Sequence, residues 1–130
     1  MNDRPDAELE ALFERYAERY MAGDAETVAA MCGAPFLAVR SGTLIHLPHK
    51  AAVQDHFAEL TAAYRKAGAS RADIQRIDTQ WQGNRAVAAT VHWIVRASDD
   101  TVIRDFRTTY QLVGPPWTIA SYVNHDLVDG

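Results

Sequence analysis

The stretch VAATVHWIV at residues 87–95 decides the fold, because its apolar side chains recur at every second position. Successive side chains of a strand point to opposite faces, so one face would carry Val87, Ala89, Val91, Trp93 and Val95. The alternation predicts a strand with one buried face.

Similar alternation continues on both sides of this stretch. A strand is expected over residues 74–81, followed by the hairpin signal at residues 82–84. After a turn at residues 98–100, a further strand would share one face among Phe106, Thr108, Tyr110 and Leu112. After Gly114-Pro115-Pro116, the last strand would share one face among Trp117, Ile119, Ser121, Val123 and His125. Strands joined in sequence by short turns predict an antiparallel meander. The charges of Arg71, Asp73, Arg76 and Asp78 alternate in sign, which predicts a solvated strand face.

The N-terminal half has helical periodicity instead. Two apolar stripes repeat at i, i+4, i+7 and i+11, namely Leu9, Phe13, Tyr16 and Tyr20, then Val53, Phe57, Leu60 and Tyr64. Between them a short helix is expected over 25–31, capped by Asp24. Two short extended pieces are expected at 36–39 and 44–47, and Pro48 is expected to start the helix that follows. Three helices that precede a run of strands predict an α+β domain with the helices packed on the sheet.

Composition limits the class of protein. The chain has 130 residues, one cysteine and a formal net charge of −4. This predicts a single domain over residues 1–130, with an ordered core of about 7–126, and no internal disulfide. The acidic balance argues against nucleic-acid binding, and the short apolar runs argue against a membrane span. The polar N-terminus is unlike a signal peptide, so we expect a cytoplasmic protein.

Four short segments together resemble the nuclear transport factor 2-like superfamily, which includes ketosteroid isomerase, scytalone dehydratase and polyketide-cyclase-like proteins. The segments are Arg15-Tyr16 with Met21-Ala22-Gly23-Asp24, residues 43–48, residues 106–112, and Trp117-Thr118-Ile119 before a C-terminal histidine. The resemblance covers about residues 7–126. It implies a strongly curved, mostly antiparallel sheet in a cystatin-like cone, an internal pocket, and a homodimer through the outer face of the sheet. It implies no single activity, because this fold hosts many.

Two residues are candidates for catalysis. Tyr16 aligns with the first-helix tyrosine that resembles the oxyanion donor of ketosteroid isomerase, and a buried phenol can stabilise negative charge on a substrate oxygen. Strand alternation places His125 on the same face as Trp117, Ile119 and Val123. We therefore expect it at the pocket mouth as a general acid or base. The alternatives are that Tyr16 only packs in the core and that His125 is a hydrogen-bonded residue at a strand end.

The steroid isomerase mechanism itself does not transfer. It needs a carboxylate base after the second helix, and residues 35–40 contain none. Strand alternation places Asp105 on the face opposite Phe106, Thr108 and Tyr110. We therefore expect Asp105 to face outward and pair with Arg104 or Arg107.

The expected pocket is aromatic and suits a small hydrophobic ring compound. Its predicted lining is Phe13, Tyr16, Tyr20, Phe57, Leu60, Tyr64, Trp93, Phe106, Tyr110 and Trp117. The alternative is that these side chains fill the cone themselves. We expect no cofactor and no metal, because His46, His49 and His56 lack supporting carboxylates in the sequence. His49 and His56 are expected at the surface or at a flank.

Two functions follow. One is an enzyme-like pocket protein that performs cofactor-free proton transfer, dehydration or cyclisation, with His125 as acid or base and Tyr16 as hydroxyl donor. The other is a non-catalytic homodimeric module that binds a ligand or a protein. The second predicts that protomers bury the outer sheet face at His92, Ile94, Arg107 and Thr109.

Overall fold

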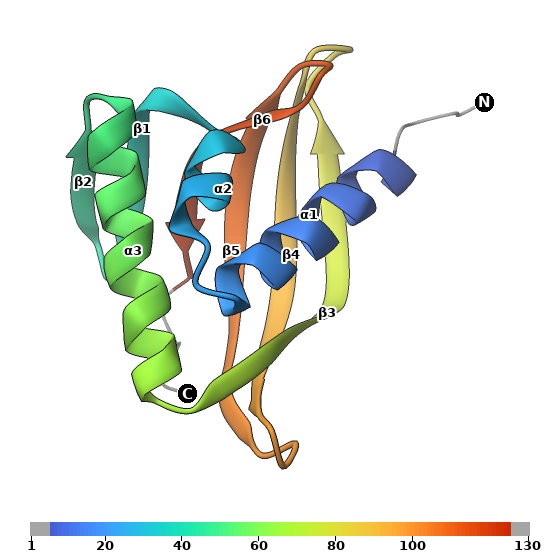
Figure 1. Cartoon of the computed structure of the whole chain (residues 1–130). Helices are drawn as coiled ribbons and strands as arrows, with labels where there is room; N and C mark the ends of the chain where they lie inside the picture. The colour runs from blue at the N-terminus through green and yellow to red at the C-terminus, as the bar shows by residue number, and fades with distance from the viewer. Residues whose placement is uncertain (1–5, 126–130) are drawn as a thin grey trace.

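Three helices cover one face of a curved six-stranded sheet in the computed structural model, which describes residues 6–125 (Figure 1). The elements follow in the order α1 (Asp6–Met21), α2 (Ala25–Ala30), β1 (Cys32–Arg40), β2 (Thr43–Leu47), α3 (Lys50–Lys66), β3 (Ala69–Trp81), β4 (Ala86–Ala97), β5 (Val102–Val113) and β6 (Thr118–Asn124). The strand order is β2-β1-β6-β5-β4-β3, so β2 and β3 are the edge strands of an open sheet. The predicted α+β fold class is confirmed. The Asp126 end of the expected core lies outside the described residues.

The helix boundaries follow from local capping. Gly23 has a φ of +77°, which lets the chain leave α1 and turn at once into α2. Asp24 is the N-cap of α2, where its carboxylate accepts the Thr27 backbone N–H at 3.1 Å. His49 is the N-cap of α3, with its Nδ1 accepting the Ala52 N–H at 3.3 Å. Pro48 therefore precedes the cap and lies outside α3. The prediction that Pro48 starts this helix is wrong.

The last four strands form the predicted antiparallel meander, with β3, β4, β5 and β6 adjacent in chain order. A register shift at Gln75 places Ile74 opposite Trp93 and Arg76 opposite His92. Because of this extra residue, Asp73 and Arg76 both face outward although their numbers differ in parity. The predicted charged face is confirmed, with Arg71–Asp73 at 3.1 Å and Arg76–Asp78 at 2.8 Å.

A second bulge lies in β6 and has a larger effect on the site. Leu112 pairs with Ile119, whereas Gln111 pairs with Ser121, so Ala120 has no partner in the ladder. An extra residue reverses the side-chain alternation beyond it. Ile119 and Tyr122 consequently face the helices, and Val123 faces the outside. The predicted single face from Trp117 to His125 is therefore wrong beyond Ile119.

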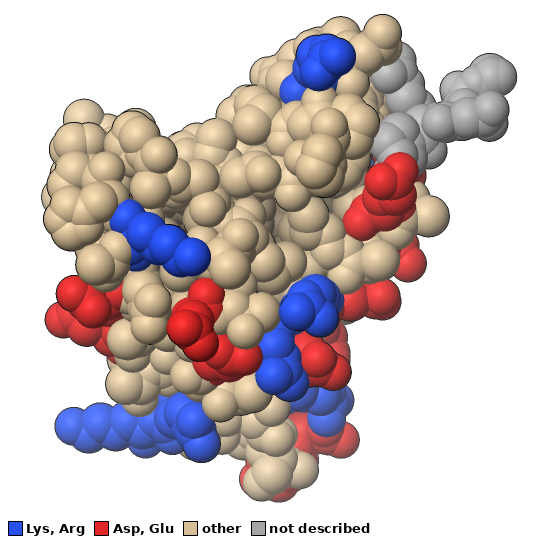
Figure 2. Space-filling model, turned by 45° about the horizontal axis from the view of Figure 1, so that its top comes forward, with Lys and Arg blue, Asp and Glu red and all other residues tan. Residues whose placement is uncertain are grey.

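The core lies between the helices and the concave face of the sheet. Its largest fully buried side chains come from both layers and include Phe13, Phe36, Phe57, Leu112 and Ile119. Acidic and basic side chains are interspersed over the face seen in Figure 2, where no broad basic area gathers. No helix within residues 6–125 is long and apolar enough to cross a membrane.

Candidate functional site

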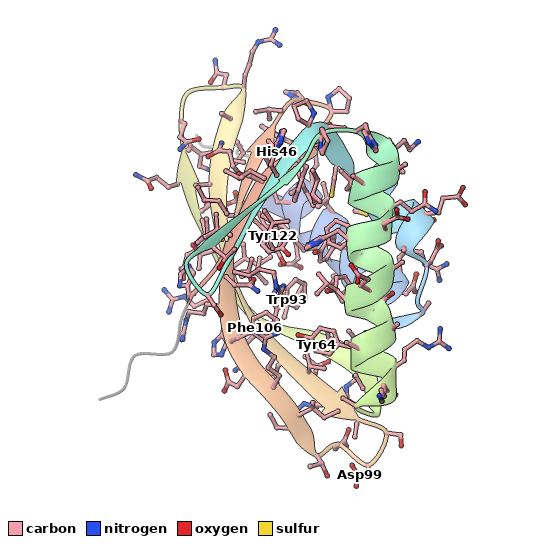
Figure 3. The ribbon with its side chains drawn as sticks, turned by 90° about the vertical axis from the view of Figure 1, so that its left-hand side faces the viewer. His46, Tyr64, Trp93, Asp99, Phe106 and Tyr122 are labelled. Atoms are coloured by element: carbon pink, nitrogen blue, oxygen red, sulfur yellow. The ribbon has the colours of Figure 1, made fainter. Side chains whose placement is uncertain are left out.

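A pocket opens between the concave face of the sheet and helices α1 and α3. About 470 Å³ in and around it is free of protein atoms, and this volume includes open solvent at the mouth. Eight of the residues predicted from sequence line it: Tyr16, Tyr20, Phe57, Leu60, Tyr64, Trp93, Phe106 and Tyr110. In Figure 3 the labelled residues Tyr122, Trp93, Phe106 and Tyr64 follow one another between the sheet and α3. The helical stripes and the strand alternation thus converge on one cavity.

The wall contributed by α1 is a set of touching rings. Tyr16 stacks on Trp93 with ring centroids 6.2 Å apart, and meets Tyr110 edge-on at 5.6 Å. Tyr20, one turn further along α1, meets Tyr64 of α3 edge-on at 5.8 Å. The α1 side of the pocket is therefore lined by aromatic rings.

The floor carries neutral hydrogen-bonding groups. The Trp93 indole Nε1–H donates to the Tyr110 hydroxyl at 2.9 Å, and both side chains are buried. Burial raises the pKa of Tyr16 well above its ordinary value, and burial also raises that of Tyr110. Both phenols therefore keep their protons at neutral pH.

One end of the pocket holds a cluster that the sequence reasoning missed. The Tyr122 hydroxyl lies 2.7 Å from His56 Nε2 and accepts a hydrogen bond from Arg40 Nη1 at 3.2 Å. Desolvation lowers the pKa of His56, and the nearby Arg40 charge lowers it further. A neutral imidazole is the acceptor that this geometry needs, so we assign the Tyr122 O–H as the donor to His56.

The other lining arginine lies on β5. Arg104 Nη1 donates to the Tyr64 hydroxyl at 2.6 Å, and its guanidinium carbon sits 4.0 Å above the centroid of the Phe106 ring. These contacts hold the cation at the pocket wall, and no carboxylate of residues 6–125 takes part.

His125 does not face the pocket, so that prediction is wrong. Its Nε2 lies 2.7 Å from the Thr109 hydroxyl on the outer face of the sheet, and its side chain is exposed. The bulge at Ala120 is the cause, because it turns Tyr122 and Asn124 inward in place of Val123 and His125. The alternative interpretation, a hydrogen-bonded histidine at a strand end, matches this geometry.

Two predicted lining residues also lie outside the pocket. Trp117 packs edge-on against Trp81 at 5.7 Å, away from the pocket wall, and its buried Nε1 has no hydrogen-bond partner among residues 6–125. Phe13 is fully buried behind the wall, with its ring 4.8 Å from that of Tyr110. It supports the lining and does not contact the cavity.

The outer face of the sheet carries the polar residues that parity assigned to it. His92 faces outward as predicted, with its Nε2 2.6 Å from Asp105 Oδ1. Asp105 is thus outward-facing, but its partner is this histidine and not a neighbouring arginine. Thr90 and Thr109 hydroxyls lie 2.7 Å apart on the same face.

The remaining histidines do not assemble into a metal site. His46 is exposed, and His49 caps α3. Within residues 6–125 no three or more His, Cys, Asp or Glu side chains come together in a way that could hold a metal ion. The expectation that His56 lies on the surface or at a flank is corrected, because His56 is half-buried and bonded to Tyr122.

Sequence signals existed for some of the missed residues. Arg104 shares parity with Phe106, Thr108 and Tyr110 on β5, and Arg40 shares parity with Phe36 on β1. The strand alternation that assigned the aromatic residues to the pocket face could therefore have assigned both arginines to it. Tyr122 could not, because nothing in the sequence marks the extra residue at position 120.

Residues 7–127 match the family described as NTF2-like protein (DUF6841), so the chain belongs to this NTF2-like family. The match confirms the superfamily resemblance and spans nearly the whole chain. No curated protein matches the sequence.

Solved structures share the fold at low identity. An NTF2-like protein with a cystatin-like fold from Novosphingobium aromaticivorans is 20% identical with a TM-score of 0.74, over 96% of this chain and 82% of that one. Aln2 from a Streptomyces species is 17% identical with a TM-score of 0.74, over 96% of this chain and 92% of that one. A protein from Catenulispora acidiphila, in complex with S-DNPA, is 18% identical with a TM-score of 0.68, over 91% of each chain. These likenesses establish the cystatin-like fold.

Proposed function

We propose that this protein binds a small, flat ring compound in the pocket between the sheet and helices α1 and α3. The observation that carries the proposal is the lining itself. Aromatic rings form the walls, and the buried tyrosines among them keep their protons. Such a surface binds a ring by stacking and orients it through a few hydrogen bonds. The Catenulispora acidiphila neighbour, solved with S-DNPA, supports the idea that this fold accommodates a ligand.

Tyr122 in the pocket wall, together with His56 to which it is hydrogen-bonded, is suited to cofactor-free proton transfer. Neutral His56 can accept the Tyr122 proton while Tyr122 takes one from a bound compound, because the two side chains are already 2.7 Å apart. Tyr16 would then stabilise charge on a ligand oxygen, the role expected from sequence. Under this proposal the acid–base role moves from His125 to His56 and Tyr122. It covers the proton transfer, dehydration or cyclisation reactions that the sequence suggested.

A thermal-shift panel of naphthols, naphthyl ketones, phenols and small steroids tests the binding. A compound at a hundredfold its dissociation constant stabilises the fold by about 2.7 kcal/mol, which raises the melting temperature by several degrees. Ala72→Leu would fill the pocket from β3 and should abolish the shift. Ala88→Leu, on the outer face of β4, is the matched control and should retain it. A panel without any shift would contradict the proposal and favour a cone filled by its own side chains.

The second candidate function is the homodimeric module, with the outer face as the interface. A specific observation favours it: Leu37, Leu44 and Val123 are exposed on that face, at 38%, 70% and 42%. Val39 is paired with both Leu44 and Val123, so the apolar side chains form one row across three strands. We propose a second copy of this chain as the occupant, because a self-complementary face closes a two-fold dimer.

A further inference from the structure

The half-buried arginines of this protein fall into two groups. Within residues 6–125, four arginines are half-buried, namely Arg19, Arg40, Arg96 and Arg104. Arg19 lies 3.4 Å from Asp24, and Arg96 lies 3.0 Å from Asp73. Arg40 and Arg104 have no carboxylate within salt-bridge distance among the described residues, and both line the pocket. The two half-buried cations without an anionic partner therefore share one cavity.

Among residues 6–125, the pocket offers these cations no negative charge. Its lining in this part of the chain contains no Asp or Glu. The groups that Arg40 and Arg104 contact are the hydroxyls of Tyr122 and Tyr64. Burial raises the pKa of Tyr122, so it is neutral under ordinary conditions. Partly desolvating a cation without a counter-charge is unfavourable, and an anion from outside would remove that cost.

Arg40 and Arg104 are hydrogen-bonded to tyrosines at opposite ends of the row of pocket residues labelled in Figure 3, and the charges of both interact with Tyr64. Arg104 donates directly to Tyr64, and Arg40 lies close enough to Tyr64 and Tyr20 for its charge to interact with both hydroxyl groups. Arg40 comes from the end of β1 and Arg104 from β5. In Figure 3 Tyr64 and Phe106, the two residues that contact Arg104, lie together at one end of the row of labelled pocket residues.

We propose that the ligand is an organic acid, bound as a monoanion, whose carboxylate is held by Arg40 and Arg104 while its flat apolar body lies against Trp93 and Tyr16. This inference rests on the proposed binding function and specifies its ligand class. A planar guanidinium matches a carboxylate in geometry, and charge-assisted hydrogen bonds are stronger than neutral ones. The apolar wall disfavours a second negative charge on the ligand, because each further charge must also be desolvated.

The test is isothermal titration of the full chain with two ligands of one shape: 2-naphthoate and its uncharged analogue 2-acetylnaphthalene. The acid should bind about 10-fold to 100-fold more tightly, the factor expected when a hydrogen bond becomes charge-assisted. Raising the salt concentration should weaken binding of the acid more than binding of the ketone.

Variants assign the effect to the two cations. Arg40→Gln and Arg104→Gln should each lower the affinity for 2-naphthoate by about tenfold and leave that for 2-acetylnaphthalene within twofold. Arg85→Gln removes the same charge from an exposed turn and should change neither affinity. Arg40→Lys keeps the charge and serves if Arg40→Gln does not fold; it should retain part of the preference for the acid.

The outcomes separate this inference from the proposal on which it rests. A preference for the acid that both arginine variants abolish supports it. Equal binding of acid and ketone would overturn the anionic ligand and leave the ring-binding pocket standing. An acid preference that Arg40→Gln and Arg104→Gln leave intact would also overturn it. If neither compound binds, both proposals fail.

Discussion

Replacing Tyr122 with phenylalanine removes one hydroxyl and nothing else from the pocket wall. The ring of Tyr122 is 3% exposed and packs against Phe36, Phe57 and Tyr110, so those contacts remain. The lost interactions are the hydrogen bond from Arg40 at 3.2 Å and the one to His56 at 2.7 Å. A neutral hydrogen bond contributes about 1 kcal/mol, and one from a charged group contributes somewhat more, reduced here because Arg40 is only half-buried.

The free energy of unfolding should therefore fall by about 2 kcal/mol, equivalent to about 8 °C in melting temperature for a domain of this size. Urea unfolding followed by tryptophan fluorescence measures it, with an unchanged m-value as the sign that two-state unfolding persists. Tyr20→Phe is the matched control. The Tyr20 ring makes similar aromatic contacts, but its hydroxyl has no hydrogen-bond partner among the described residues, so it should cost under about 0.5 kcal/mol. If the two variants lose equal stability, the Tyr122 hydroxyl does not hold the cluster together.

Three further predictions concern charge, capping and assembly. The pKa of His56 is lowered in the folded protein, so His56 takes up a proton more readily in the unfolded chain. The free energy of unfolding should therefore fall as the pH drops below about 6.5. In a profile of melting temperature against pH from 5 to 7.5, His56→Gln should reduce this fall. Asp24→Ala removes the α2 cap and should cost about 1 kcal/mol in urea unfolding, and Asp24→Asn should recover most of it; equal losses would contradict the capping role. Val123→Asp should convert the proposed dimer to a monomer in sedimentation velocity. Val102 is similarly exposed at the start of β5, and Val102→Asp should leave the dimer intact. A wild-type protein that is monomeric at micromolar concentration would refute the interface.

The elements and most of the pocket could be predicted because they depend on local periodicity. Residues spaced by 3.6 along α1 and α3 and by 2 along β4 and β5 must share a face, whatever the tertiary structure. Trp93 and Tyr110 illustrate this, since alternation placed them inside and they meet at 2.9 Å.

The errors arise where an irregularity interrupts the period. An alanine at position 120 carries no mark of a bulge, yet it reverses the facing of the side chains from 121 to 125, and His125 lies outside the pocket as a result. His56 was missed for a different reason. Its partner Tyr122 is 66 positions away in the chain, and no short-range pattern reports that proximity. Because the bulge prevented the prediction of Tyr122 as a pocket residue, its contacts with His56 and Arg40 could not be predicted either.

The most direct measurement of ligand binding in the pocket uses the indole N–H resonances of the protein in a nitrogen–proton correlation spectrum. The chain has three tryptophans, and each signal can be assigned with a single Trp→Phe variant. Trp93 lines the pocket and donates its indole N–H to Tyr110, whereas Trp81 and Trp117 pack on each other outside the pocket. Titration with 2-naphthoate should shift the Trp93 signal progressively to saturation and leave the other two in place. A spectrum in which Trp93 stays unmoved at saturating 2-naphthoate, or in which only Trp81 and Trp117 respond, would contradict binding in this pocket.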